Sequence, residues 1–126
     1  MKKIFIAIFF YSMAHISTAQ KPNVDSILQK VAVEKDEDKK VDLLVSLISA
    51  ETNNNPEFTI EIGLKLLNQS KGENKNIEIA VAYSFLGQGY RLLGNNIKAL
   101  AYHHKAIASA EKSNNLSILA CTENKL

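Results

Sequence analysis

The sequence is poor in the residues that mark several classes of protein. Its 126 residues include one cysteine, which excludes an intramolecular disulfide and a zinc site made of several cysteines. Two prolines and five glycines are too few for a collagen-like or low-complexity chain, and an apolar content of 46% is that of ordinary globular material. A chain of this length holds one small domain at most, and therefore a thin core.

The chain also has no large excess of positive or of negative charge. The chain has 15 lysines and arginines against 13 aspartates and glutamates, a formal net charge of +2. Lys2 and Lys3 lie in a segment that we interpret below as a removable leader, so the remaining residues carry thirteen charges of each sign. Nucleic acids and anionic membranes are held by a basic excess. The balance therefore predicts that the chain has no nucleic-acid partner.

The first nineteen residues have the three parts of a secretory signal peptide. Lys2 and Lys3 are positive, residues 4–11 (IFIAIFFY) are apolar, and residues 17–19 (STA) are small residues before a cut at Gln20. The apolar run is shorter than the roughly 20 residues that a spanning helix needs. We therefore expect a bacterial signal peptide over residues 1–19 and an exported chain, periplasmic or secreted, that is not itself inserted in the membrane. The alternative is a leader that is kept as an N-terminal anchor.

Export would place the thiol of Cys121 in an oxidising compartment. A lone cysteine in an oxidising compartment can pair with a second chain. The alternative, which we favour, is a small buried residue on a helix.

Internal similarity at a spacing of 40 residues relates two separate helical segments. With this shift, residues 59–62 (TIEI) fall on residues 99–102 (ALAY), and residues 65–67 (KLL) fall on residues 105–107 (KAI). The same shift places residues 79–80 (IA) on residues 119–120 (LA). Because one period relates helices of two types, the pattern predicts stacked helix pairs rather than a single amphipathic helix.

Apolar residues at helical spacing, with turn residues between them, predict an all-α chain without a strand. Asn55 suits a helix N-cap, Gly94 a C-terminal stop, and Asn95 or Asn96 the next N-cap. We expect a solvated charged link over Glu34–Lys40 (EKDEDKK), where the interleaved lysines make cation binding the weaker alternative. The helices are expected at residues 25–33, 40–50, 56–68, 77–93, 97–112 and 116–126.

Small and bulky residues follow a set register in the best-formed pair of helices. With Ala80 as the first position, seven residues match a pattern of W, L, G, Y, G, A and A: Tyr83, Leu86, Gly87, Tyr90, Gly94, Ala99 and Ala106. This register resembles that of the tetratricopeptide repeat family, in which the small residues let two helices approach and the bulky ones fill the space between them. His103 stands at the usual aromatic site and Glu111 at the terminal proline site, and the spacing of 40 exceeds the family's common length of about 34 residues.

The resemblance implies a short right-handed solenoid of antiparallel helix pairs. A leading helix and the charged link would occupy residues 20–40, and two repeats would occupy residues 41–74 and 77–115. A partial repeat would follow over residues 116–126, as a truncated last helix.

The outer repeats match the pattern less well. In the first, Leu44, Leu47, Thr59 and Leu66 correspond, but Ile48 and Glu51 replace the glycine and the tyrosine. The last segment looks like half of a further first helix, so the chain would be the front part of a longer protein or a truncated product of one. Since each repeat of a solenoid buries its apolar face on the next, we expect self-association through an open C-terminal face that exposes Ile118, Leu119 and Leu126.

The order of the N-terminal segments suggests which members of the repeat family the chain resembles most. A leader is followed by residues 25–28 (DSIL), by a charged link ending at residues 39–41 (KKV), and by residues 53–57 (NNNPE). This order looks like the exported N-terminal repeat region of bacterial sensor proteins. In that family the repeats precede a transmembrane helix and a cytoplasmic output module, either a histidine kinase or a DNA-binding regulator. Neither part is within these 126 residues, so the resemblance carries over no kinase activity.

The sequence offers few candidate catalytic residues. His103 and His104 are adjacent on an expected helix and point about 100° apart, so metal binding by both is a weaker alternative than His103 replacing a core aromatic. Residues 87–89 (GQG) lack a preceding strand and a third glycine, and so do not form a phosphate loop. We therefore expect no enzyme, no cofactor and no metal site.

The resemblance implies a binding surface instead. In this family the first helices of each pair line a concave groove that holds an extended peptide or a partner helix. By position, the groove residues would be Val81, Ser84, Gln88 and Arg91 in the better repeat and Asp42, Val45 and Ser49 in the weaker one. Gln88 and Arg91 can donate hydrogen bonds to backbone carbonyls or to a carboxylate. The alternative is that all seven are ordinary solvent-facing positions.

Two functions follow from this interpretation. The first is a non-catalytic exported module that binds a protein or peptide partner through its helical groove. The second is the sensory N-terminal part of a membrane signalling protein, of the histidine kinase or transcription regulator type, without its output domain. The sequence downstream of Leu126 distinguishes them, because a hydrophobic span of roughly 20 residues there supports the second.

Overall fold

The computed structural model describes residues 24–50, 55–72 and 74–123, and within these ranges the regular structure is entirely helical. The helices are α2 (Val24–Val33), α3 (Glu37–Ala50), α4 (Pro56–Gln69), α5 (Asn76–Leu92), α6 (Asn96–Ser113) and α7 (Leu116–Glu123). The all-α class is thus confirmed for this part of the chain. The signal peptide expected over residues 1–19 lies outside it. None of the described helices combines the length and the apolar character needed to cross a membrane.

Local signals place several helix ends where the sequence predicts them. The Asn55 side chain accepts a hydrogen bond from the Phe58 amide at 3.1 Å, which caps the start of α4. Asn95 accepts one from the Lys98 amide at 3.2 Å and caps α6 in the same way. Between α5 and α6, Gly94 has a φ of 78°, a left-handed conformation that glycine adopts at low cost. These predictions are therefore confirmed.

The charged run that was expected as a link is mostly helix. α3 begins at Glu37, so the connection from α2 is confined to residues 34–36. Oε1 of Glu34 accepts hydrogen bonds from the amides of Lys35 and Asp36, both at 2.9 Å, and Oδ1 of Asp36 accepts one from the Lys39 amide at 3.2 Å. The expectation of a link as far as residue 40 is wrong, because side-chain capping and acidic residues in the first turn start a helix inside the run.

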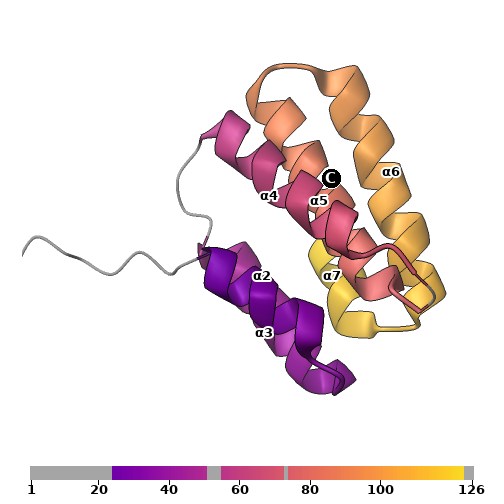
Figure 1. Ribbon diagram of the computed structural model, residues 1–126. Helices are drawn as coiled ribbons and strands as arrows, with labels where there is room; N and C mark the ends of the chain where they lie inside the picture. The colour runs from indigo at the N-terminus through magenta and orange to yellow at the C-terminus, as the bar shows by residue number, and fades with distance from the viewer. Residues whose placement is uncertain (1–23, 51–54, 73, 124–126) are drawn as a thin grey trace, which may run out of the picture.

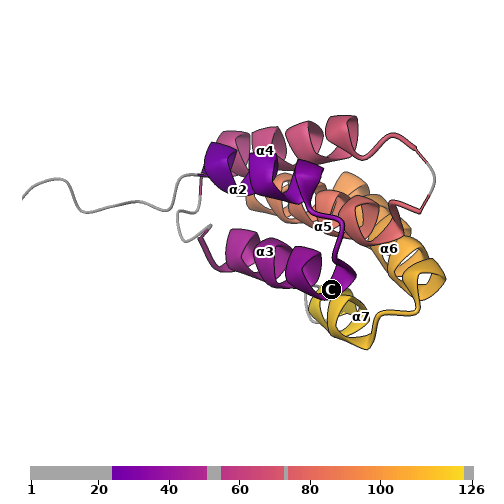
Figure 2. The ribbon, with the colours of Figure 1, turned by 60° about the horizontal axis from the view of Figure 1, so that its bottom comes forward.

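Helix α5 lies at the centre of the fold (Figure 1). It packs most extensively against its chain neighbours α4 and α6, and it also contacts α3 and α7. Helices α2 and α3 form a second pair, and α2 runs beside α4 (Figure 2). The helices thus form two groups, the α2–α3 pair and helices α4–α7. The core joins both groups through buried side chains that include Leu28, Val31, Leu44, Leu47, Ile62, Leu66, Val81, Phe85 and Ile118.

Three glycines let the helices around α5 approach closely. A Cβ atom at Gly87 would stand 2.9 Å from three atoms of the His103 ring on α6, and one at Gly89 would stand 2.5 Å from Cγ1 of Ile60 on α4. Gly63 of α4 faces α5 with similar closeness. The sequence predicts the role of Gly87 and the place of His103 in the core, and both are confirmed. It does not predict the contacts of Gly63 and Gly89.

Helix α3 departs from the expected pairing. The repeat expected over residues 41–74 pairs α3 with α4, whereas α3 packs mainly on α2. Helix α2 in turn is joined to α4, because the Gln69 side-chain amide donates to the Leu28 carbonyl at 3.0 Å and Nζ of Lys65 lies 3.2 Å from Oδ1 of Asp25. Adjacent helices are therefore packed in pairs, while the right-handed solenoid stays a prediction.

Helix α7 is packed against α5 and α6. Ile118 has no exposed surface, and Leu119 is half-buried. The expectation that this segment exposes Ile118 is wrong, because α7 turns that residue into the core shared with α5. Leu126 lies outside the described residues, and Leu116, at the start of the helix, is exposed. Self-association through this face stays a prediction.

Candidate functional site

A polar cleft lies where the first turns of α3 and α5 meet the end of α6. Its volume is about 520 Å³. The lining includes four lysines and two glutamates, and consists of Lys35, Glu37, Lys40, Asn74, Lys75, Asn76, Ile77, Glu78, Lys112 and Ser113. We call this the lysine cleft. It brings together charged side chains from three segments that are far apart in the sequence.

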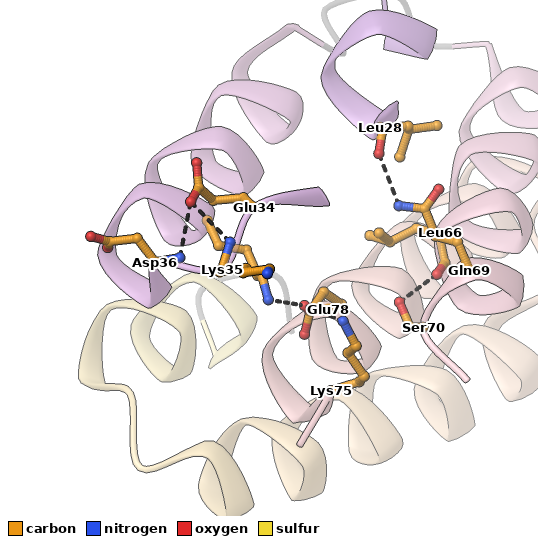
Figure 3. Close-up of polar contacts among 10 residues, drawn as sticks. Leu28, Glu34, Lys35, Asp36, Leu66, Gln69, Ser70, Lys75 and Glu78 are labelled. Carbon is orange, nitrogen blue, oxygen red and sulfur yellow. Dashed lines mark hydrogen bonds and ion pairs between the residues drawn. The ribbon is translucent and has the colours of Figure 1, made fainter. Parts of the chain in front are cut away.

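Glu78 is the buried centre of the lysine cleft. Its side chain is 4% exposed, and its Oε1 lies 2.9 Å from Nζ of Lys40 on α3, whose side chain is 13% exposed. Nζ of Lys75 is 3.9 Å from the same oxygen. Figure 3 shows the Glu78 carboxylate between Lys75 and the start of α3. Because a buried carboxylate is costly without a cation beside it, the Lys40–Glu78 pair couples the α2–α3 pair to α5.

The lysine cleft keeps a surplus of positive charge after this pairing. Its four lysines exceed its two glutamates by two charges. Lys35 and Lys112 make no ion pair with any residue in the described ranges. Helix α5 also begins here without a side-chain cap, since Lys75 at the N-cap position makes no capping hydrogen bond. The amides of the first turn and the positive end of the helix dipole therefore add to the positive potential of the cleft.

The four predicted groove residues of α5 differ in exposure. Val81 is 1% exposed and Ser84 is also buried, because both lie on the part of α5 that the other helices cover. Gln88 is half-buried and Arg91 is exposed. As the chain is folded here, α5 therefore offers surface to a partner mainly along its last turns.

The predicted groove residues of α3 lie on a different part of the molecule. Asp42 and Val45 are exposed, while the side chain of Ser49 lies outside the described part of the structure. Asp42 lines a shallow groove of about 400 Å³ between α2 and α3, together with Lys30, Val33, Glu34, Lys39, Leu43 and Ser46. Asp42 thus belongs to the surface of the α2–α3 pair, whereas Arg91 belongs to the end of α5 that is remote from the lysine cleft.

An exposed apolar surface surrounds the turn between α5 and α6. Leu93 and Leu100 are each about half exposed, and Ile97 is 86% exposed. Ile97 and Leu100 are three residues apart on α6 and so share one face of the helix. Arg91 is exposed on the last turn of α5, next to the turn. We call Arg91, Leu93, Ile97 and Leu100 the turn patch.

Stacked tyrosines hold α5 against α6. The ring of Tyr102 stacks on Tyr83 and Tyr90, with centroid separations of 5.9 and 5.6 Å. Nζ of Lys98 lies 5.0 Å from the centroid of Tyr90, and Nζ of Lys105 lies 5.5 Å from that of Tyr102. Such ring pairs and cation–π contacts stabilise the hairpin that carries the turn patch.

The remaining chemical candidates are dispersed. His103 is buried against Gly87 while His104 is exposed, so the two rings face different surroundings, as the sequence predicts. Cys121 is half-buried on α7. In residues 24–50, 55–72 and 74–123, no three His, Cys, Asp or Glu side chains are grouped as a metal site would require.

Sequence reasoning misses the lysine cleft. One signal for it is present: Glu78 stands between Ile77 and Ile79 in a helix that is apolar on two faces, and a carboxylate in such a helix predicts a cation beside it. That the cation is Lys40, on another helix, follows from the tertiary fold alone.

No family model, curated protein or solved structure matches the chain. Its function is therefore inferred from its own residues.

Proposed function

We propose that the chain is a non-catalytic, exported interaction module with tetratricopeptide-like helix pairs, which binds a peptide or a partner protein through its helical surface. The turn patch carries this proposal. It gathers three large exposed apolar side chains and an arginine around one turn. Exposed apolar clusters mark interaction surfaces, and arginine is enriched in protein interfaces.

The side chains of the turn patch supply two kinds of contact. Burial of a side chain as exposed as Ile97 contributes about 1.5–3 kcal/mol to association, before the entropic costs of binding are subtracted. The Arg91 guanidinium adds directional hydrogen bonds to carbonyls or to a carboxylate of the partner. Gln88 is three residues earlier on α5, hence on the same helix face, and extends this polar edge.

The turn patch is also held in place before binding. Gly94 and the Asn95 cap fix the turn, and the stacked tyrosines fix the hairpin beneath it. A surface ordered in advance loses less conformational entropy when a partner binds. This rigidity favours a binding role over a merely tolerated exposure of apolar residues.

Selection from a random peptide display library against the full chain tests the proposal. We expect enriched peptides whose Kd weakens at least about tenfold in the Ile97→Ser/Leu100→Ser variant and in Arg91→Gln, because each change removes about 1.4 kcal/mol or more of contact. Leu64→Ser is the matched control, since Leu64 is 54% exposed but lies on α4.

Two outcomes would overturn the proposal. One is a library that yields no enriched peptide for the unmodified chain. The other is enriched peptides whose affinity falls as much in Leu64→Ser as in the turn-patch variants. Each variant should show the same far-ultraviolet circular dichroism signal as the unmodified chain. A loss of binding then cannot be attributed to unfolding.

Export rests on the leader and has its own test. The chain recovered from outside the cytoplasm should begin at Gln20 when its N-terminus is sequenced. Recovery in the cytoplasm with Met1 in place would contradict this part of the proposal.

A further inference from the structure

We infer that the lysine cleft is a binding site for a small polyanion that carries at least two carboxylate or phosphate groups. This site goes beyond the proposed partner binding, which uses the opposite end of α5. The 17 residues of α5 separate the two places by about 25 Å at 1.5 Å per residue.

The charge of the lysine cleft is larger than the fold requires. Lys40 alone gives the buried Glu78 carboxylate a cation at 2.9 Å. Lys75 approaches the same oxygen to 3.9 Å, and Lys35 and Lys112 are not ion-paired within the described part of the chain. Lysines gathered around one concave space repel each other, and a bound anion removes this repulsion.

The hydrogen-bond donors in the lysine cleft match oxyanions in particular. Ammonium groups from three segments point to a ligand with several acceptor oxygens, because charge-assisted hydrogen bonds to carboxylate and phosphate are the strong ones. The side-chain amides of Asn74 and Asn76 add neutral donors. The uncapped first turn of α5 contributes further amides, as an addition to the lysines and not as a site by itself.

The size of the lysine cleft decides between a single ion and a larger anion. A volume of about 520 Å³ falls in the range of small-molecule sites, roughly 300–1,000 Å³. A lone phosphate would fill only a small part of that space. A ligand with two or more oxyanion groups can contact α3, α5 and α6 together.

Binding there would tie the two groups of helices together. The lysine cleft is lined by the start of α3 on one side and by α5 and α6 on the other. The Lys40–Glu78 ion pair crosses the same boundary. A polyanion that contacts both sides adds to that link, so the bound chain should unfold at a higher temperature than the free chain.

Titration of the full chain with pyrophosphate and with citrate, at constant ionic strength, tests the inference and separates phosphate from carboxylate ligands. We expect saturable binding of at least one of them by calorimetry, with the largest amide NMR shifts at Asn76–Glu78. The Lys75→Gln/Lys112→Gln variant should weaken that Kd at least roughly tenfold, since it removes two charge-assisted contacts. Lys98→Gln is the matched control, because Lys98 and Lys112 are on the same helix but about 21 Å apart.

Single replacement of Lys112 keeps the test independent of folding. Lys112 is exposed in the last turn of α6 and is not a partner of Glu78, so Lys112→Gln should keep the helical signal and still weaken binding. The inference is overturned if neither anion binds saturably, if Lys98→Gln weakens binding as much as the cleft variant, or if a glutamate-rich peptide binds where both small anions fail. Peptide selection at the turn patch is unaffected by these outcomes, so the two proposals fail separately.

Discussion

His103 of α6 occupies the space that a side chain at Gly87 of α5 would need. A Cβ atom at position 87 would lie 2.9 Å from three atoms of the imidazole, and His103 as a residue is 3% exposed. The close approach of α5 and α6 therefore depends on glycine at one position and on a flat ring at the other. This relationship gives the clearest test of how the central hairpin is built.

Replacement of Gly87 by alanine should destabilise the fold. Helix propensity alone predicts the opposite, a gain of about 1 kcal/mol, because alanine is the better helix former. We expect instead a loss of about 1–3 kcal/mol in the free energy of unfolding, because the buried His103 ring has little room to move away from the new methyl group. Urea denaturation followed by circular dichroism measures this difference, and its sign decides between the two effects.

A double-mutant cycle with His103→Ala provides the control. Removal of the ring opens the space, so Gly87→Ala should be neutral or stabilising in the His103→Ala background. Equal costs of Gly87→Ala in both backgrounds would show that the ring is not the cause.

The helices themselves were predictable because their signals are local. Asn55, Gly94 and Asn95 act within a few residues of their own positions, and apolar spacing reports the buried face of each helix. The same locality explains why Gly87 and His103 could be placed in the core: both belong to one hairpin with a short turn. The start of α3 differs from the prediction although its signal is local: the alternating charges of residues 34–40 indicate a solvated run, whereas the Asp36 side chain accepts a hydrogen bond from the Lys39 amide and caps a helix.

The candidate site was not predictable in this way. Lys40 and Glu78 belong to different helices and meet through the packing of the α2–α3 pair, which no periodicity in the sequence reports. The burial of Val81 has the same origin, since it depends on the helices that pack over α5. Repeat register identifies which residues share a face, but tertiary packing decides whether that face is open.

Removal of one partner of the Lys40–Glu78 pair should be costly. Lys40→Met leaves the nearly buried Glu78 carboxylate with Lys75 at 3.9 Å as its nearest cation, and we expect a loss of about 3 kcal/mol in the free energy of unfolding. Thermal and urea denaturation at neutral pH measure the loss. Lys39→Met is the matched control, because Lys39 is the exposed neighbour and should change stability by less than about 0.5 kcal/mol.

The double replacement Lys40→Met/Glu78→Leu separates pairing from packing. With both charges gone, no buried carboxylate is left without its cation, so stability should return to within about 1 kcal/mol of the unmodified chain. A double variant as unstable as Lys40→Met would indicate that the lysine stem, and not the ion pair, holds α3 against α5.

Replacement of Ile118 by serine should unfold α7 from the core. Ile118 has no exposed surface, so Ile118→Ser removes apolar burial and adds an enclosed hydroxyl, at an expected cost of about 3–4 kcal/mol. Leu116→Ser, at an exposed position on the same helix, is the control and should be nearly neutral. An Ile118→Ser variant that is as stable as the control would restore the open C-terminal face that the sequence predicts.

Lys65 should give a small part of the stability that disappears in alkaline solution. Its ammonium lies 2.9 Å from Oε1 of Glu61 and 3.2 Å from Oδ1 of Asp25. These hydrogen bonds raise the pKa of Lys65 above its usual value, and the contact with Glu61 has the larger effect. A pKa that rises on folding contributes stability below the unfolded value, and this contribution is lost as the pH rises through the folded value. The stability advantage of the unmodified chain over Lys65→Met should therefore be present at neutral pH and shrink above the pKa of the lysine.

This stability advantage should be slight at every pH, because the Lys65 ammonium is exposed to water and to salt screening. Urea denaturation of both chains across this pH range measures the difference, and an advantage that grows with pH would contradict the assignment.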